Sequence, residues 1–204
     1  MTGKRPSVNT RAYHHGDLRR VALEIAVDIM ERQGAENLNL RAVAKRAGVT
    51  PMALYRHFDD KAALLAAVGR HGFTLLRQRL DAAAVDGPAP QRLAAWGVAY
   101  VLFARDHPDV YRQMFAGPPA WQDAAARAAL PDNPDTVFGM MTVFLRAEFP
   151  AGEVELARLT AWSFVHGLAL LIVDRRLAPF PPDVEGVTSA VTAFFTQRLL
   201  ARPA

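Results

Sequence analysis

Residues 38–61 decide the fold, and they read LNLRAVAKRAGVTPMALYRHFDDK. Asn39 is a good N-cap residue, apolar side chains recur after it at helical spacing, and Gly48 follows the last of them. A short helix is therefore expected between Asn39 and Gly48. A second one is expected to open at Thr50-Pro51, because Thr50 can cap it and a proline needs no N–H at the first helical position. A helix, a tight turn and a second short helix form the layout of a helix-turn-helix.

The second short helix divides into an apolar face and an outward face. Val49 and Leu54 stand at the two positions of a hydrophobic staple, and Tyr55 and Phe58 continue the apolar face. The outward residues are Pro51, Met52, Ala53 and Arg56, with Tyr55 and His57 at the edge. Small residues at the start of such a helix allow a close approach to a DNA major groove.

Further helices are expected on both sides of this motif. One is expected to start at Asp17, an N-cap residue, and to end at Gly34, while Asp60 can cap a longer helix through Leu80. Beyond Gly87, helical periods alternate with proline-rich breaks. They predict helices near residues 89–106, 108–116, 119–129, 134–148, 152–177 and 184–201. The predicted fold class is all-α, with about nine helices.

The last two expected helices carry the strongest apolar stripes. The stripes consist of Val154, Ala157, Ala161, Phe164, Val165, Leu168 and Ile172 on the first helix, and of Val187, Val191, Phe194 and Leu199 on the second. Each stripe is wide enough to pack inward and outward, so this pair is the best candidate for a homodimer contact through a four-helix bundle. The alternative is a monomer whose last helices close its own core.

Charge is distributed unevenly along the 204 residues. Residues 1–80 hold 14 Lys and Arg against 7 Asp and Glu, whereas residues 81–204 hold 10 against 13. A basic N-terminal part joined to a mildly acidic remainder indicates two parts with different partners. The basic part suits nucleic acid or an anionic membrane, and charge does not choose between them.

Composition excludes several classes of protein. With 51% apolar and 22% charged residues the chain is typical of globular proteins, and with no cysteine it has no disulfide, thiol nucleophile or cysteine-ligated metal. The polar, basic N-terminus does not look like a secretory signal. The longest strongly apolar run, residues 167–173, is short of the roughly 20 residues that cross a bilayer. We therefore expect a soluble, cytoplasmic protein without a membrane partner.

The helix-turn-helix stretch resembles the DNA-binding domain of the TetR (tetracycline-repressor) family of bacterial transcription regulators. The resemblance covers roughly residues 13–65 and rests on Tyr13-His14-His15-Gly16-Asp17-Leu18, Leu40-Arg41, Val43-Ala44, Ala47-Gly48-Val49-Thr50, Leu54-Tyr55, His57-Phe58 and Lys61. Trp162, His166 and Gly167 also resemble the Trp…His-Gly element of one C-terminal domain type in this family. The resemblance implies a DNA-binding domain over residues 1–60, with an arm at about 1–14, and a ligand-binding and dimerisation domain over 61–204.

The resemblance also implies roles for residues in the first domain. Thr50, Tyr55, His57 and Lys61 match positions that bind DNA phosphates, and Pro51, Met52 and Ala53 match the base-reading surface. Arg41 matches a position that contacts a phosphate or a base. Since Met52 and Ala53 cannot make bidentate hydrogen bonds to bases, thymine methyls are their expected contacts, and Arg41, Arg56 and DNA shape are expected to add specificity. Lys4, Arg5 and Arg11 form either an arm along the DNA or a solvated tail.

A small-molecule effector is implied for the second domain. The candidate ligand residues are large flat or flexible side chains, which suit an adaptable apolar pocket: Trp96, Tyr100, Phe103, Met114, Phe115, Phe138, Met141, Trp162 and His166. Few charges interrupt these helices, so a lipophilic effector is expected. His166 is alternatively a core or subunit-contact histidine, and Tyr55 is alternatively a core tyrosine.

The function that follows is a sequence-specific, homodimeric transcription regulator. Family habit favours a repressor that a lipophilic effector releases from a palindromic operator. An all-α enzyme is one alternative, but no nucleophile motif accompanies His166, and Asp59-Asp60 suits a helix cap better than acid–base catalysis. A basic module that binds an acidic protein is another. Adjacent His14 and His15 lack a carboxylate pair to complete a metal site, so no metal or other cofactor is expected.

Overall fold

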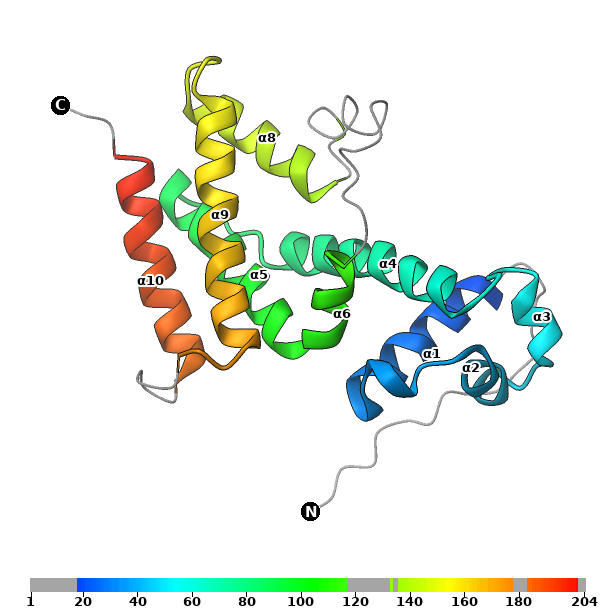
Figure 1. Ribbon diagram of the computed structural model, residues 1–204. Helices are drawn as coiled ribbons and strands as arrows, with labels where there is room; N and C mark the ends of the chain where they lie inside the picture. The colour runs from blue at the N-terminus through cyan, green and yellow to red at the C-terminus, as the bar shows by residue number, and fades with distance from the viewer. Residues whose placement is uncertain (1–17, 117–132, 134–135, 178–182, 202–204) are drawn as a thin grey trace. The chain divides into compact units, whose positions relative to one another are not determined.

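The computed structural model describes residues 18–116, 133, 136–177 and 183–201 of the chain (Figure 1). Within these residues it contains helices and no strands, which confirms the predicted all-α fold class. The chain forms two compact units, residues 1–67 and residues 68–204. The helix expected over residues 119–129 and the basic residues Lys4, Arg5 and Arg11 lie outside the described residues.

The first unit contains α1 (Leu18–Gln33), the 3₁₀ turn η1 (Ala35–Asn37), α2 (Leu40–Ala47) and α3 (Pro51–Tyr55). The local signals act as predicted: Asn39 Oδ1 accepts a 2.8 Å hydrogen bond from the Ala42 N–H, and Gly48 ends α2 at a φ of 69°. Gly34, with a φ of 88°, follows the last residue of α1. Because few residues other than glycine adopt such a φ, these two positions fix where α1 and α2 stop.

The core of the first unit is built from one face of each of its helices. Its fully buried members include Ala22, Ile29, Leu38, Val43, Leu54, Phe58 and Leu64. At the surface, Asp28 of α1 accepts hydrogen bonds from Arg46 of α2 and from Arg32. Burial works to raise the pKa of Asp28, but these two guanidinium groups outweigh it and hold that pKa below its usual value.

The next helix, α4 (Lys61–Ala82), begins in the first unit and ends in the second. Asp60 caps it as expected, because its Oδ1 accepts a 2.7 Å hydrogen bond from the Ala63 N–H. The division between the two compact units falls within this helix, after Ala67, whereas the domain boundary expected from the sequence lies at its first residue.

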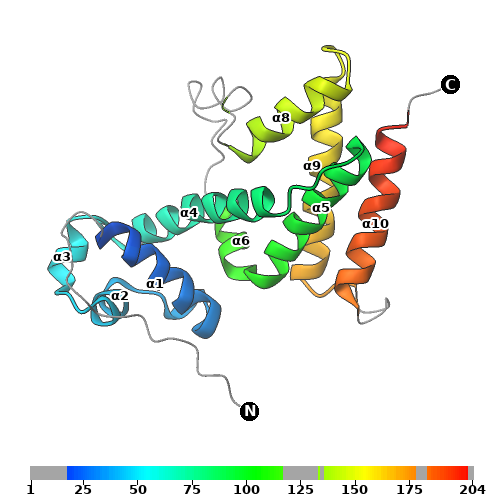
Figure 2. The same ribbon diagram turned by 180° about the vertical axis from the view of Figure 1, so that it is seen from behind.

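The second unit continues with α5 (Ala89–Asp106), α6 (Pro108–Met114), α8 (Val137–Glu148), α9 (Val154–Val173) and α10 (Val184–Leu199). Figures 1 and 2 show α5, α9 and α10 side by side, and α5 packs against both of the others. The main core cluster includes Leu76, Val101, Phe103 and Ala169, and the rings of Phe164 and Phe195 stack at 3.9 Å.

The inward face of α10 differs from the predicted one. The expected stripe contained Val191 and Phe194, but both are exposed, and the buried residues of α10 are Thr188, Thr192 and Thr196. Helix α5 passes close to this threonine face, since a Cβ on Gly97 would lie 2.5 Å from the Thr192 methyl. Small β-branched side chains therefore fill the contact between α5 and α10, while Val191 and Phe194 remain exposed.

Helix α9 is long and apolar enough to cross a membrane by length and hydropathy alone, although the sequence predicted a much shorter apolar run. The stripe expected on this helix is largely confirmed, because Val154, Ala157, Ala161 and Val165 are buried. Core helices of globular proteins pass the same test of length and hydropathy, and α9 packs against α5, α8 and α10.

Candidate functional site

Helix α3 is held to the first unit by a single buried residue, Leu54. The side chain of Met52, two residues earlier, is 66% exposed. Nearly all residues expected to meet DNA share this accessibility: Arg41, Thr50, Pro51, Met52, Tyr55, Arg56, His57 and Lys61 are exposed, and Ala53 is half-buried. The structure therefore gathers the expected DNA-contact residues of α3 on its outward side.

Two details of this surface differ from the prediction. Thr50 occupies the N-cap position of α3, but its side chain makes no capping hydrogen bond. Tyr55 and Phe58 were both expected to continue the apolar face. Phe58 is buried, but Tyr55 is 43% exposed. A five-residue helix that follows a tight turn presents few positions to the core, and in α3 Leu54 occupies the buried one.

Several cations of the first unit are exposed or contact residues next to the helix-turn-helix. Lys61, at the start of α4, donates a 3.1 Å hydrogen bond from Nζ to the backbone carbonyl of Glu36. Arg19 of α1 lies over the ring of Phe58, with 5.6 Å from its guanidinium carbon to the ring centroid. Arg41 and Arg56 are exposed as well, and cations together with exposed apolar side chains such as Met52 suit DNA phosphates and base methyls.

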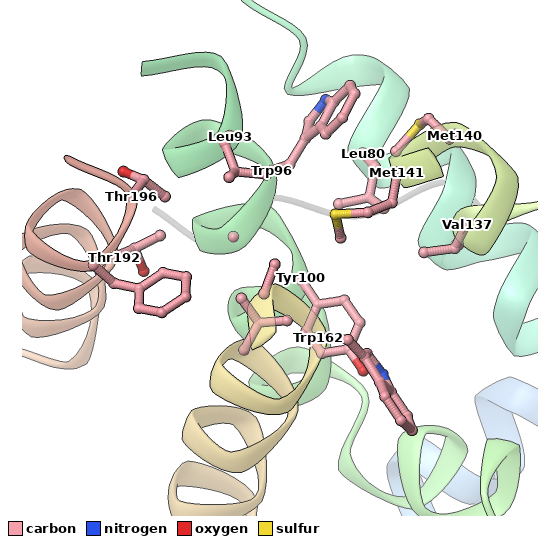
Figure 3. A pocket seen from close by; sticks show the side chains of 14 residues that line it. Leu80, Leu93, Trp96, Tyr100, Val137, Met140, Met141, Trp162, Thr192 and Thr196 are labelled. Atoms are coloured by element: carbon pink, nitrogen blue, oxygen red, sulfur yellow. The ribbon is translucent and has the colours of Figure 1, made fainter. Parts of the chain in front are cut away.

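The second unit contains an apolar cavity of about 40 Å³ between α5, α8, α9 and α10 (Figure 3). Four of the predicted ligand residues line it, namely Trp96, Tyr100, Met141 and Trp162. Several other lining residues were not predicted from the sequence, and these include Leu80, Gly97, Val137, Met140, Thr192 and Phe195. The spacing of Thr188, Thr192 and Thr196, every fourth residue, is the signal that would have placed a face of α10 at this cavity.

The remaining predicted ligand residues lie elsewhere in the second unit. Phe103 and Met114 are buried in the main core. Phe115, His166 and Phe138 do not line the cavity, but Trp162 connects them: ring centroids lie 4.6 Å apart for Phe115–His166, 5.3 Å for His166–Trp162 and 5.6 Å for Trp162–Phe138. His166 is therefore one ring removed from the cavity wall.

His166 belongs to a polar cluster beneath the cavity. Its Nδ1 lies 2.7 Å from the Tyr111 hydroxyl and 3.2 Å from the Tyr100 hydroxyl, and the two hydroxyls lie 3.1 Å apart. Burial lowers the pKa of His166 and raises the pKa of Tyr100 to about 12, so the uncharged forms are favoured. Tyr100 lines the cavity and also belongs to this cluster, which links the two structurally.

An exposed second short helix that follows a tight turn and is anchored by one buried residue is the arrangement of a helix-turn-helix DNA-binding regulator. Residues 22–68 match the family model described as bacterial regulatory proteins, tetR family, and residues 93–195 match the tetracyclin repressor-like C-terminal domain. The chain belongs to the TetR family of transcription regulators. This finding agrees with the resemblance seen in the sequence.

Several known proteins are similar to this chain. A protein of unknown function from Rhodococcus sp. RHA1 is 30% identical, with a TM-score of 0.70 over 94% of this chain and 100% of that one. An uncharacterized HTH-type transcriptional regulator, YobS of Bacillus subtilis (strain 168), is 25% identical over 96 residues, which are 47% of this chain and half of the length of YobS. TetR-Q116A from Acinetobacter baumannii AYE, solved in complex with minocycline, shares the fold at 19% identity, with a TM-score of 0.57 over 93% of this chain and 95% of that one.

Proposed function

We propose that this regulator is a cytoplasmic, homodimeric repressor that a mainly apolar small molecule releases from a palindromic operator. In this proposal residues 1–60 bind DNA, and residues 61–204 bind the ligand and form the dimer. The observation that carries it is the outward exposure of α3, whose one buried residue is Leu54. A helix held in this way can enter a major groove without unfolding its own core.

Phosphate contacts and base contacts are assigned to different side chains. The Thr50 hydroxyl, which α3 does not use as a cap, is available to a phosphate oxygen, as are Tyr55, His57 and Lys61. Met52 and Ala53 face the bases and select thymine through its methyl group, while Arg41 and Arg56 add hydrogen bonds. Phosphate contacts give affinity and salt dependence, and base contacts give sequence preference.

The dimer is proposed to form on the outward faces of α9 and α10. Leu156 and Leu159 of α9 and Val191 and Phe194 of α10 are all exposed, and a Cβ on Gly167 would meet nothing within 4 Å. Exposed apolar residues on neighbouring helices are typical of interaction surfaces, and a two-fold pair of such helices makes a four-helix bundle. Two heads in a symmetric dimer read half-sites that lie about 34–36 Å apart.

Ligand control is proposed to act through α4. This helix begins at Lys61 in the DNA-binding unit, and its Leu80 lines the cavity. A ligand that fits better when α4 takes a position unsuited to DNA shifts the dimer away from its operator. Near-complete switching requires a preference of about 10⁴-fold, roughly 5.5 kcal/mol, which two cavities in a dimer can share. Minocycline bound to a TetR structure of the same fold supports small-molecule control.

Footprinting tests this function. The full chain is incubated with duplex DNA that flanks its own gene, at several salt concentrations, with and without a panel of apolar aromatic compounds. We expect two protected half-sites, an affinity that falls steeply with salt, and release by at least one compound. Binding that is insensitive to salt, or a single protected half-site, would refute the proposed mode of DNA binding.

A further inference from the structure

Two hollows in the second unit share one wall. The apolar cavity has a volume of about 40 Å³ and lies inside the unit. A second, open hollow of about 470 Å³ is lined by Ala84, Val85, Asp86, Gly87, Arg92 and Trp96. Trp96 lines both, so the outer hollow and the inner cavity meet at this residue. Figure 3 shows Trp96 at one end of the inner cavity.

Trp96 and Arg92 both pack against the ring of Phe144. Trp96 meets Phe144 edge to face at 5.2 Å, and the guanidinium of Arg92, one helical turn earlier on α5, lies 5.1 Å from the centroid of the same ring. Arg92 forms no ion pair within the part of the chain that the structure describes. Its guanidinium donors are therefore available to a ligand at the mouth of the outer hollow.

We propose that the two hollows, which meet at Trp96, form one effector site for an amphiphile with an apolar body and an anionic group. The apolar body occupies the inner cavity, and the anionic group binds Arg92 in the outer hollow. This inference rests on the ligand-binding role proposed above and adds the chemical class of the ligand.

The chemistry of each hollow fits one part of such a ligand. Aromatic, aliphatic and thioether side chains and two threonines line the inner cavity, and none of the lining residues is charged, so a charge placed there would have no oppositely charged partner. Ligand pockets usually measure about 300–1,000 Å³, so the inner cavity must widen as a ligand enters. Met140 and Met141 are the side chains best able to yield, because thioether chains turn easily among rotamers.

The outer hollow combines a cation with an opposing charge. Arg92 attracts an anion, and Asp86, on the same rim, repels it. Removal of the Arg92 charge must therefore weaken the binding of an anionic ligand, and removal of the Asp86 charge must strengthen it. The affinity for a neutral ligand of the same shape should not change in either case. This opposition gives the inference a signature that mere apolar adsorption does not have.

Two matched dyes provide the test. Anilinonaphthalene sulfonate carries an anionic group on an apolar ring system, and phenylnaphthylamine is the same skeleton without the sulfonate. Both are titrated into the full chain, and dissociation constants are measured from dye fluorescence. We expect Arg92→Gln to weaken sulfonate binding about three- to tenfold, Arg92→Lys to restore most of it, and Asp86→Asn to strengthen it, with no change for the neutral dye.

Two further variants locate the dyes. Arg70→Gln, which removes an exposed arginine of α4 outside both hollows, is the matched control and should leave both affinities unchanged. Trp96→Ala removes the side chain that both hollows share and should change the affinity and binding rate of both dyes. Circular dichroism and thermal melting show that each variant is folded.

The outcomes separate this inference from the proposed function. Failure of the neutral dye to bind, or its indifference to Trp96→Ala, would overturn the ligand cavity and this inference together. If the neutral dye binds and responds to Trp96→Ala, but Arg92→Gln alters sulfonate binding no more than Arg70→Gln does, the anionic subsite is wrong and the apolar cavity stands.

Discussion

The hydroxyl oxygen of Tyr111 lies 2.7 Å from Nδ1 of His166, and Tyr100 reaches the same nitrogen at 3.2 Å. Three titratable side chains from α5, α6 and α9 thus meet at one point. Burial lowers the pKa of His166 and raises those of both tyrosines, so folding favours the uncharged form of each. The cluster also stands behind Tyr100, a wall residue of the apolar cavity.

This cluster predicts a loss of stability in mild acid. With its pKa lowered in the folded chain, His166 binds a proton more readily when unfolded, so its contribution is present above about pH 6.5 and is lost as pH falls through the folded-state pKa. Denaturant unfolding at fixed protein concentration from pH 8 to pH 5 measures this. His166→Asn should reduce the pH dependence, whereas His57→Asn, at an exposed site, should leave it unchanged. Equal pH profiles for wild type and His166→Asn would contradict the assignment.

A second prediction concerns the threonine face of α10. Thr188 and Thr192 are both fully buried, but the Thr188 hydroxyl donates to the Val184 carbonyl, whereas that of Thr192 has no partner among the described residues. A buried hydroxyl without a partner costs about 1–3 kcal/mol. Thr192→Val should therefore raise the free energy of unfolding by about 1 kcal/mol, as measured by denaturant titration. The matched change Thr188→Val removes a made hydrogen bond, and an equal gain there would contradict this reasoning.

The sequence predicted the first unit closely because its signals are local. Asn39, Gly48, Pro51 and Asp60 each act on backbone groups within a turn of the chain, so helix ends follow from them without knowledge of the fold. The outward position of Met52 followed in the same way, from its place in a short helix anchored by Leu54.

The second unit was harder to predict from the sequence. The helical period of apolar residues shows which face of a helix is apolar, but it does not show which other helix packs against that face. In α10 Val191 and Phe194 of the predicted stripe lie outside and threonines face inward, so hydrophobicity alone did not show which face of the helix packs against α5. The ligand residues were chosen by size and flatness, which separates neither Phe103 in the core nor His166 in its polar cluster from the walls of a cavity. Cavity-lining residues can be distinguished from core residues only when the positions of the helices relative to one another within the second unit are known.

The outward face of α9 and α10 predicts how the chain associates. Phe194 is 64% exposed, with the Arg198 guanidinium 5.4 Å from its ring centroid. Phe194→Glu should place a charge in the proposed dimer contact and shift the dimer toward monomer, as measured by sedimentation velocity. DNA affinity should fall with it, because one head reads only a half-site. Val143→Glu, a matched change of an exposed apolar residue on α8, should leave the dimer intact. A dimer that survives Phe194→Glu would place the contact elsewhere.

The exposed thioether of Met52 predicts that this regulator reads thymine methyl groups. A random duplex library is prepared with either thymine or uracil, which lacks only the 5-methyl group, and binding is selected in both. If Met52 packs on a methyl, uracil at one position of each half-site should weaken binding about threefold or more, since a buried methyl is worth about 0.8 kcal/mol. Met52→Ala should remove most of that difference, whereas Thr50→Val, which removes a neutral contact to a phosphate, should weaken binding to both libraries equally. Met52→Ala with an undiminished preference for thymine would show that another side chain reads the methyl group.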